Sequence, residues 1–134
     1  MKAILDTNVV LRYLLDDDAR QAATARKLVR QAKRLVIPVP VLCEVAWILS
    51  RSLKIDKAKV ADAIEALVKS PKVEADRATV LAGLAFLRAG GDFADGAIAQ
   101  EGNDMGGNVF ATFDKQAATL HAKLLTGASV KLLT

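Results

Sequence analysis

Short apolar runs alternate with longer amphipathic segments along the whole chain. Runs of mostly apolar residues that suit buried strands cover residues 3–5, 35–37, 72–75, 108–113 and 130–133. The segments between them repeat apolar residues three or four positions apart, as helices do, and cover residues 9–15, 19–33, 41–49, 57–69, 77–89, 92–100 and 115–123. This alternation predicts an α/β fold, a three-layer α/β/α sandwich around a central, mostly parallel sheet of four to five strands.

The composition indicates a single folded domain. Residues 1–134 contain no linker, repeat or low-complexity tract, and 52% of them are hydrophobic against 25% charged, which favours a packed core over disorder. No apolar run approaches the roughly 20 residues of a membrane span. The N-terminus enters a strand without a charged and apolar leader, so we expect a cytoplasmic protein that does not bind membranes.

The chain has one cysteine and one histidine, which exclude a disulfide framework and a Cys/His zinc cluster. We expect Cys43 to be a small buried hydrophobe. We expect His121, near the end of a short helix, to lie at the surface or in the C-terminal turn. Neither residue suggests a catalytic nucleophile.

Carboxylates stand where predicted strands end. Asp6 follows the first strand, Glu44 lies past the second, and Asp114 follows the strand at 108–113. Because the carboxyl ends of parallel strands meet at one edge of a sheet, we expect these three acids to lie together. Asp95 opens the helix that leads into the last of these strands, so topology places it less directly.

The aspartates at helix starts also have a purely structural explanation. Asp6, Asp92 and Asp95 could each cap a helix by accepting hydrogen bonds from its free backbone N–H groups. Capping does not explain the acid inside the third predicted helix, however. We therefore assign Asp6 to a shared acidic site and expect Thr7 or Asn8 to cap the first helix.

Glu44 interrupts the most apolar predicted helix, residues 41–49. This segment is apolar on nearly all sides, so we expect it to be buried. An ionised carboxylate is costly to remove from water unless it meets a cation or hydrogen-bond donors. Three explanations of Glu44 remain open. Its side chain reaches an exposed strip of the helix, it forms a structural ion pair with Arg12 or Arg51, or it binds a metal ion or acts as a general base.

Several carboxylates in one pocket raise each other's pKa unless a divalent cation neutralises them. Ligands that are all oxygen select a hard ion such as Mg²⁺ or Mn²⁺. Such an ion activates a bound water and stabilises the charge that develops in phosphodiester hydrolysis. The acids therefore predict metal-dependent phosphodiester cleavage.

The charge balance suits a polyanionic partner. Lys and Arg number 19 and Asp and Glu number 15, for a net charge of +4. Basic residues recur at helical spacing in and just after residues 19–33, either as a solvated face or as a surface that contacts RNA phosphates. They are Arg26, Lys27, Arg30, Lys33 and Arg34.

Four motifs together resemble a PIN-domain ribonuclease, and the whole chain is similar to VapC-type toxins of type II toxin–antitoxin systems. In chain order the motifs are Leu5-Asp6-Thr7-Asn8, Pro40-Val41-Leu42-Cys43-Glu44-Val45, Asp92-Phe93-Ala94-Asp95-Gly96-Ala97-Ile98-Ala99 and Thr112-Phe113-Asp114. One departure is Ala117-Ala118, where relatives often carry a bulky aromatic residue, and it bears on helix packing more than on chemistry.

The resemblance implies specific roles and partners. It identifies a catalytic, metal-binding quartet of Asp6, Glu44, Asp95 and Asp114, with auxiliary roles for Asp92, Asn8 and Thr112. It also implies an endoribonuclease that acts on structured RNA such as transfer RNA. A homodimer and a small VapB-like antitoxin, whose tail covers the acidic site, are further expectations from the resemblance.

Two other functions remain open from the sequence. A metal-dependent phosphatase or phospho-acceptor domain also places aspartates at strand ends, and Lys115 beside Asp114 would be its lysine. A module that binds RNA or a protein partner without catalysis would share the basic surface. The presence of all four acids argues against the second of these.

Overall fold

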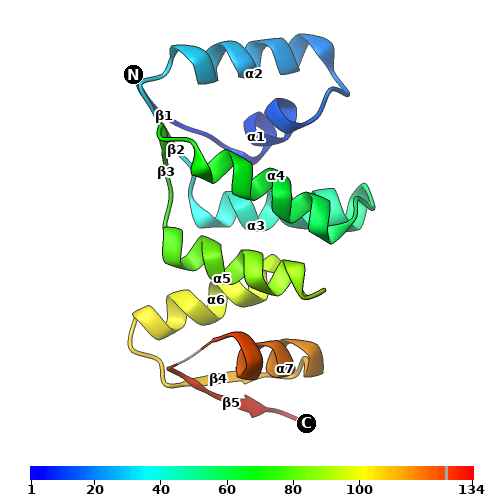
Figure 1. Cartoon of the computed structure of the whole chain (residues 1–134), viewed down its shortest axis with the longest axis vertical. Helices are drawn as coiled ribbons and strands as arrows, with labels where there is room; N and C mark the ends of the chain where they lie inside the picture. The colour runs from blue at the N-terminus through cyan, green and yellow to red at the C-terminus, as the bar shows by residue number, and fades with distance from the viewer. Residues whose placement is uncertain (126) are drawn as a thin grey trace.

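Strands of two to four residues alternate with helices in the computed structural model, which describes residues 1–125 and 127–134 (Figure 1). The strands are β1 (Lys2–Ile4), β2 (Arg34–Val36), β3 (Val73–Glu74), β4 (Val109–Thr112) and β5 (Ser129–Leu132). The helices are α1 (Thr7–Leu14), α2 (Ala19–Gln31), α3 (Val39–Trp47), α4 (Lys57–Lys69), α5 (Arg77–Arg88), α6 (Phe93–Asp104) and α7 (Lys115–Leu124), and α3 continues into a π-helical turn, η1 (Ile48–Ser52). Each predicted strand and helix is therefore present.

The strands form two separate parallel sheets. One has the order β1-β2-β3 and the other pairs β4 with β5. The predicted α/β fold and the parallel strands are confirmed. The prediction of one continuous central sheet is wrong for this structure, because β1 and β4 are not hydrogen-bonded to each other.

The pair of helices α5 and α6 explains why the sheets are separate. Figure 1 shows this pair between the three-stranded sheet and the unit made by β4, α7 and β5. The helices approach closely because Gly96 has no side chain: a Cβ there would lie 2.4 Å from the carbonyl oxygen of Ala82. On its other side α5 buries Val80, Leu84 and Leu87 in the main core. The pair therefore fills the space between the two sheets.

The main core lies between the β1-β2-β3 sheet and the helices α1, α3, α4 and α5. Its most buried side chains, each at most 1% exposed, include Leu5, Leu35, Ile37, Leu42 and Ile64. No helix in the described part of the chain is long and apolar enough to cross a membrane.

An ion-pair network ties the three strands of the first sheet together. Glu74 on β3 accepts Lys2 Nζ of β1 at 2.7 Å and Arg34 Nη2 of β2 at 3.0 Å. These cations lower the pKa of Glu74, with the hydrogen bond from Lys2 as the largest cause. Arg34 Nη1 also donates to the carbonyl oxygen of Pro71 at 3.0 Å. Arg34 therefore belongs to the sheet and not to the basic face of α2.

Helix α7 covers one face of the β4-β5 sheet. The ring of His121 is 1% exposed and stacks on Phe110 of β4, with 4.9 Å between ring centroids. His121 lies in the last turn of α7, which is one of the two predicted positions, but the surface position is wrong because this histidine faces the strand beneath its helix. Ala117 and Ala118 are also buried, so small side chains pack on this side of α7.

Candidate functional site

Asp6 and Asp114 each end a strand and cap the helix that follows. Asp6 Oδ1 accepts the Val9 N–H at 3.0 Å, and Asp114 Oδ1 accepts the Ala117 N–H at 3.0 Å. The prediction that Thr7 or Asn8 caps α1 is therefore wrong, since the aspartate at the N-cap position makes this bond itself. Both carboxylates remain exposed, so capping does not remove them from solvent.

Thr112 supports the second of these junctions. Its Oγ1 accepts the backbone N–H of Asp114 at 3.0 Å, which fixes the turn between β4 and α7. Thr112 therefore helps to position Asp114, and its auxiliary role in catalysis stays a prediction.

Asp95 lies near two other carboxylates. Burial raises the pKa of Asp95, and the negative charges of Asp92 and Asp114 raise it further. Within residues 1–125 and 127–134, no hydrogen bond or ion pair to the side chain of Asp95 offsets this cost. The ionised carboxylate of Asp95, at the start of α6, is therefore repelled by neighbouring carboxylates, and no described cation or hydrogen-bond donor offsets this repulsion.

Asp92 occupies the N-cap position of α6 without a side-chain capping bond. Its carboxylate instead meets Arg51 Nη2 at 3.1 and 3.3 Å and Lys57 Nζ at 3.5 Å. Lys57 also donates to the carbonyl oxygens of Gly90 and Gly91 at 2.9 and 2.8 Å. These two cations hold the turn before α6 and partly neutralise the acidic group.

Sequence reasoning did not connect these cations with the acidic motif. Arg51 and Lys57 lie 41 and 35 positions before Asp92, and no local pattern links them to it. The ion pairs proposed for Glu44 are absent among the described residues, since Arg51 binds Asp92 and Arg12 binds Asp17 at 2.6 Å.

Glu44 is exposed, which confirms the alternative that its side chain lies on an exposed strip of the helix. The buried face of α3 carries Leu42, Val45 and Ala46, whereas Glu44 lies on the opposite strip with Trp47, which is 59% exposed. A surface hollow of about 380 Å³ opens at this strip, between α3 and the start of α6, and is lined by Cys43, Glu44, Trp47, Ile48 and Ala94.

A second hollow of about 70 Å³ adjoins it and reaches Asp92 and Asp95 past Trp47 and Ala94. Glu44 and Asp95 therefore border neighbouring parts of one groove. Cys43 at its floor is half-buried instead of fully buried. Burial raises the pKa of its thiol, and Glu101 and Glu44 raise it further, which keeps the thiol protonated and unreactive.

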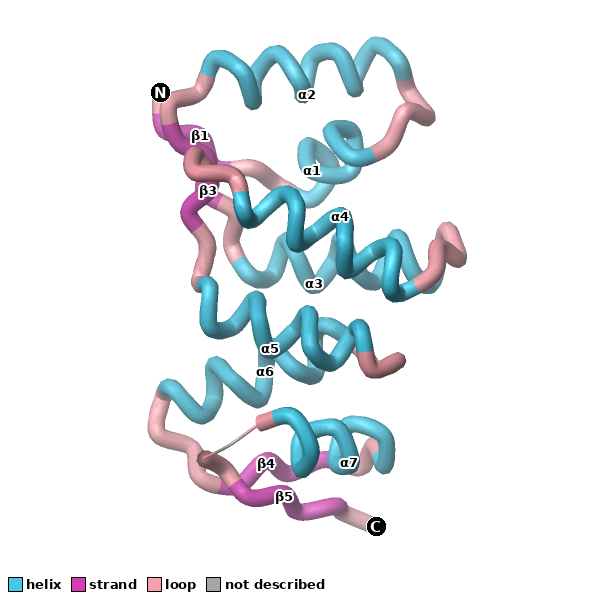
Figure 2. The backbone as a smooth tube through the Cα atoms, in the orientation of Figure 1, coloured by secondary structure: helices cyan, strands magenta, loops and turns pink. Residues whose placement is uncertain are grey.

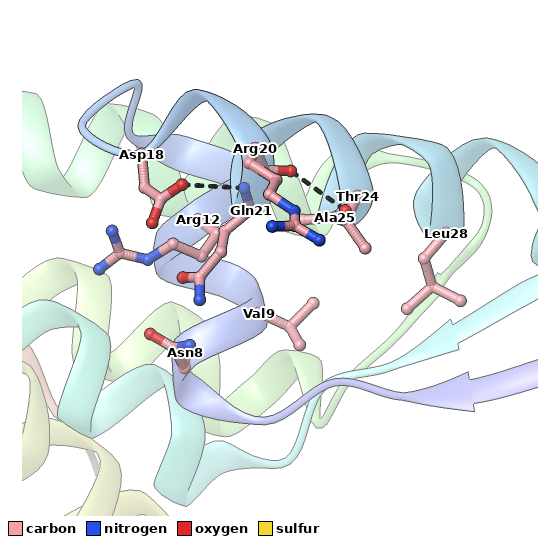
Figure 3. Close-up of a pocket in the computed structure, with 9 residues that line it drawn as sticks. All are labelled: Asn8, Val9, Arg12, Asp18, Arg20, Gln21, Thr24, Ala25 and Leu28. Carbon is pink, nitrogen blue, oxygen red and sulfur yellow. Dashed lines mark hydrogen bonds between the residues drawn. The ribbon is translucent and has the colours of Figure 1, made fainter.

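Asn8 faces a different hollow, the cavity of about 490 Å³ between α1 and α2. Figure 3 shows Asn8 and Val9 on α1 and the side chain of Gln21 directed from α2 toward Asn8, and Arg20 and Leu28 also line the cavity. The auxiliary residue Asn8 therefore lines a polar-rimmed cavity two positions from Asp6.

The basic residues predicted to contact RNA differ in whether they form ion pairs within the protein. Arg26 binds Asp16 at 2.7 Å. Lys27, Arg30 and Lys33 are exposed at or near α2. These three keep their charge available to a polyanion.

The four predicted metal ligands do not meet at one point. In the described part of the chain, no three His, Cys, Asp or Glu side chains lie close enough together to hold a metal ion. The chemistry of the donor set suits a hard divalent cation, but this arrangement of the chain does not assemble it. The acids are split between the β1–α1 junction and the group formed by Asp92, Asp95 and Asp114.

The sequence can also be compared with known protein families. The sequence model of the PIN domain family matches residues 3–123. The chain belongs to the PIN domain family. No curated protein matches it. PIN domains are generally nucleases, so the family match indicates a hydrolase that acts on nucleic acid, and such domains typically use divalent metals. The match also contains every acid of the quartet.

Proposed function

We propose that this PIN domain is an endoribonuclease that depends on Mg²⁺ or Mn²⁺ and acts in the cytoplasm as the VapC-type toxin of a toxin–antitoxin pair. Its substrate is structured RNA such as transfer RNA, and a small VapB-like antitoxin inhibits it by covering the acidic site. The functional form is a homodimer.

One observation carries this proposal. Asp95 is half-buried beside two other carboxylates and lacks a neutralising partner among the described residues. Such an arrangement costs stability and has no capping role to justify it. A divalent cation would relieve this repulsion, and family membership supplies the matching nuclease chemistry.

The proposed quartet is Asp6, Glu44, Asp95 and Asp114, whose carboxylates would bind the cation when they are brought together. The cation would supply an activated water and stabilise charge on the phosphate. Asp114 is held in place by Thr112 and by its own capping bond, so its carboxylate is fixed before RNA binds.

The family match favours a nuclease over the phosphatase or phospho-acceptor alternative. Lys115 is exposed and makes no ion pair with Asp114 among the described residues. No structural feature specifically supports that alternative.

The test is RNA cleavage by purified protein, with mapping of the new 5′ ends. Wild type should cut RNA with Mg²⁺ and stop when the metal is chelated, and Asp6→Asn should lose about a hundredfold or more of this activity. Asp76→Asn is the matched control, because Asp76 also caps a helix, α5, through the Thr79 N–H. Equal cleavage by wild type and Asp6→Asn would reject the proposal, and RNA binding without any product would indicate a module without catalysis.

A further inference from the structure

The cavity between α1 and α2 is a separate feature from the groove at Glu44 and Asp95 (Figure 2). Its volume of about 490 Å³ is within the usual range for a site that binds a small molecule. Asn8 lines it from the first turn of α1, two positions after Asp6. An occupant of this cavity would therefore contact a residue less than one helical turn from an acid of the proposed quartet.

Two side-chain amides on opposite walls of the cavity are free to bind a ligand. Figure 3 shows the side chain of Gln21 directed from α2 toward Asn8 on α1. Both residues are exposed, and among residues 1–125 and 127–134 neither amide group forms a hydrogen bond. Each amide offers a donor and an acceptor, which is the combination that reads the edge of a nucleobase.

Arg20 adds a free positive charge at the rim. This residue is exposed, and its side chain makes no ion pair with another described residue. Arg12 also lines the cavity, but its Nη1 already binds Asp17 at 2.6 Å. Asp18, an acid of the lining, accepts the Gln21 backbone N–H at 3.0 Å. Because the guanidinium of Arg20 has no carboxylate partner, it is suited to a phosphate group.

The interior of the cavity is apolar. Val9 lines it from α1, and Ala25 and Leu28 line it from α2. Ala25 is only 6% exposed, so this part of the lining is shielded from water. Proteins that read a single base hold its face between apolar side chains and form hydrogen bonds to its edge. The cavity combines these two features with a cation for the phosphate.

We propose that this cavity binds one unpaired nucleotide of the RNA substrate, next to the bond that is cut. The apolar interior covers the face of the base, Asn8 and Gln21 form hydrogen bonds to its edge, and Arg20 binds its phosphate. The nucleotide must be unpaired, because base pairing would occupy that edge. The selection of a cleavage site rests on the proposed nuclease function, whereas the binding of a nucleotide does not.

The charges along α2 favour RNA over a protein segment as the occupant. Lys27 follows Arg20 by seven residues, which places both on one side of the helix. Lys27 and Arg30 are exposed and form no ion pair among the described residues. A single strand with one nucleotide in the cavity can run its backbone along these cations. RNA carries a phosphate at each nucleotide, whereas a protein segment would need acids at matching intervals.

NMR titration of the whole protein tests the binding directly. Each of the four nucleoside 5′-monophosphates, added without metal, should shift the side-chain amide signals of Asn8 and Gln21, and one base should do so at a lower concentration than the others. The amide of Gln31, at the end of α2 and outside this cavity, is the internal control. Unmoved signals of Asn8 and Gln21, or equal responses to all four nucleotides, would overturn the proposal and favour a protein segment as the occupant. The same shifts with inorganic phosphate alone would also overturn it.

Two substitutions separate the contact to the base from the contact to the phosphate. Gln21→Leu removes one amide and should reduce the difference in affinity among the four nucleotides. Arg20→Gln removes the charge and should weaken the binding of all four about tenfold or more, because a hydrogen bond to a charged group is lost. Gln31→Leu and Lys59→Gln are the matched controls at exposed positions outside the cavity. If both cavity variants bind nucleotides as their controls do, the assignment of these contacts is wrong.

A third variant fills the cavity and keeps every polar group that the proposal uses. Thr24 is exposed, lines the cavity and donates its hydroxyl to the Arg20 carbonyl at 3.0 Å. Thr24→Phe should abolish the nucleotide-dependent shifts of the two amide signals. Thr119→Phe is the control, since exposed Thr119 donates to the Lys115 carbonyl of α7 at the same distance. A folded Thr24→Phe variant that binds nucleotides as wild type does would contradict the proposal.

Mapping of new RNA 5′ ends connects the cavity to cleavage. Wild type should prefer one base at a fixed position beside its cut sites, and Gln21→Leu should lose this preference while Gln31→Leu keeps it. An unchanged preference in Gln21→Leu would show that another part of the protein selects the base.

The experiments separate this inference from the proposed nuclease function. If wild type cuts no RNA but its amide signals respond to nucleotides, the nuclease proposal fails and the nucleotide site stands. If wild type cuts RNA but these signals do not respond, the nucleotide site fails and the nuclease proposal stands.

Discussion

Asp6 and Asp114 hold the same position in two strand-to-helix junctions. Each directs Oδ1 to the backbone N–H three residues later, Val9 in one case and Ala117 in the other, and both distances are 3.0 Å. Each aspartate therefore combines a structural bond with an exposed negative charge. The two contributions can be separated by substitution.

Asp6→Asn should keep the cap and lose the charge, because an asparagine oxygen also accepts at the N-cap position. We expect unfolding in urea to change little and RNA cleavage to be lost. Asp6→Ala should lose both, and its free energy of unfolding should fall by about 1 kcal/mol. If Asp6→Asn unfolds as easily as Asp6→Ala, the loss of activity cannot be assigned to the charge.

Asp95→Asn should raise the melting temperature at neutral pH in the absence of metal. Because the pKa of Asp95 is raised in the folded state, its stabilising protonated form is lost as pH rises and the charged form opposes folding. Asp92→Asn is the contrasting variant, since it removes ion pairs to Arg51 and Lys57 and should not stabilise the protein. If Asp95→Asn and Asp92→Asn shift the melting temperature equally, the repulsion at Asp95 and the ion pairs of Asp92 do not differ in their effect on stability as the structure indicates.

Gly96→Ala should destabilise the protein by about 1–3 kcal/mol, because its Cβ would lie 2.4 Å from the backbone oxygen of Ala82 and would push α5 and α6 apart. Gly102→Ala, in the same helix, meets no atom within 4 Å and should stabilise by up to about 1 kcal/mol through helix propensity. Urea denaturation of both variants measures the contrast. A neutral Gly96→Ala would mean that the helices do not pack at this distance.

His121 should make stability fall at mildly acidic pH. Burial lowers the pKa of His121, and its Nδ1 is buried without a hydrogen-bond partner in the described structure. The folded state therefore binds this proton less readily than the unfolded state, whose histidine pKa is about 6.5. Stability is full above that value and declines as pH falls below it. Between about pH 7.5 and 5.5, roughly one unit either side of that value, the His121→Phe variant should show a flatter stability curve than wild type. If the stability curves of wild type and His121→Phe are parallel, a group other than His121 causes the pH dependence.

Charge reversal at Lys27 and Arg30 should weaken RNA binding and reduce its dependence on salt, with a change in slope of about two if both contact phosphates. Binding at several salt concentrations measures this. Lys59→Glu, an exposed change on α4, is the control for net charge. Unchanged binding by the double variant would make this part of α2 an ordinary solvated face.

The sequence predicted the elements well because their signals are local. The capping aspartates Asp18, Asp56 and Asp76 all accept backbone N–H groups at helix starts, as their positions at helix boundaries indicate. The exposed position of Glu44 stayed one of several alternatives, because α3 exposes only a narrow strip and a helix of nine residues with so few polar positions has little periodicity to reveal it.

Features that depend on distant contacts were not predictable in this way. The position of the helix pair α5 and α6 between the two sheets depends on contacts such as the approach of Gly96 to Ala82, which joins two separate helices. The burial of His121 follows from its stacking on Phe110, which belongs to a different element. The acids were recognised as a set from their order in the chain, but whether three of them lie close enough to hold a metal ion depends on tertiary packing that their order does not encode.

The ion pairs of Glu74 also protect one edge of the first sheet. Strand β3, at the far edge of this sheet, is only two residues long, and Arg34 engages both Glu74 and the carbonyl of Pro71 beside it. A short edge occupied by charged side chains is a poor template for another strand. The protein should therefore resist aggregation through the β3 side of the sheet.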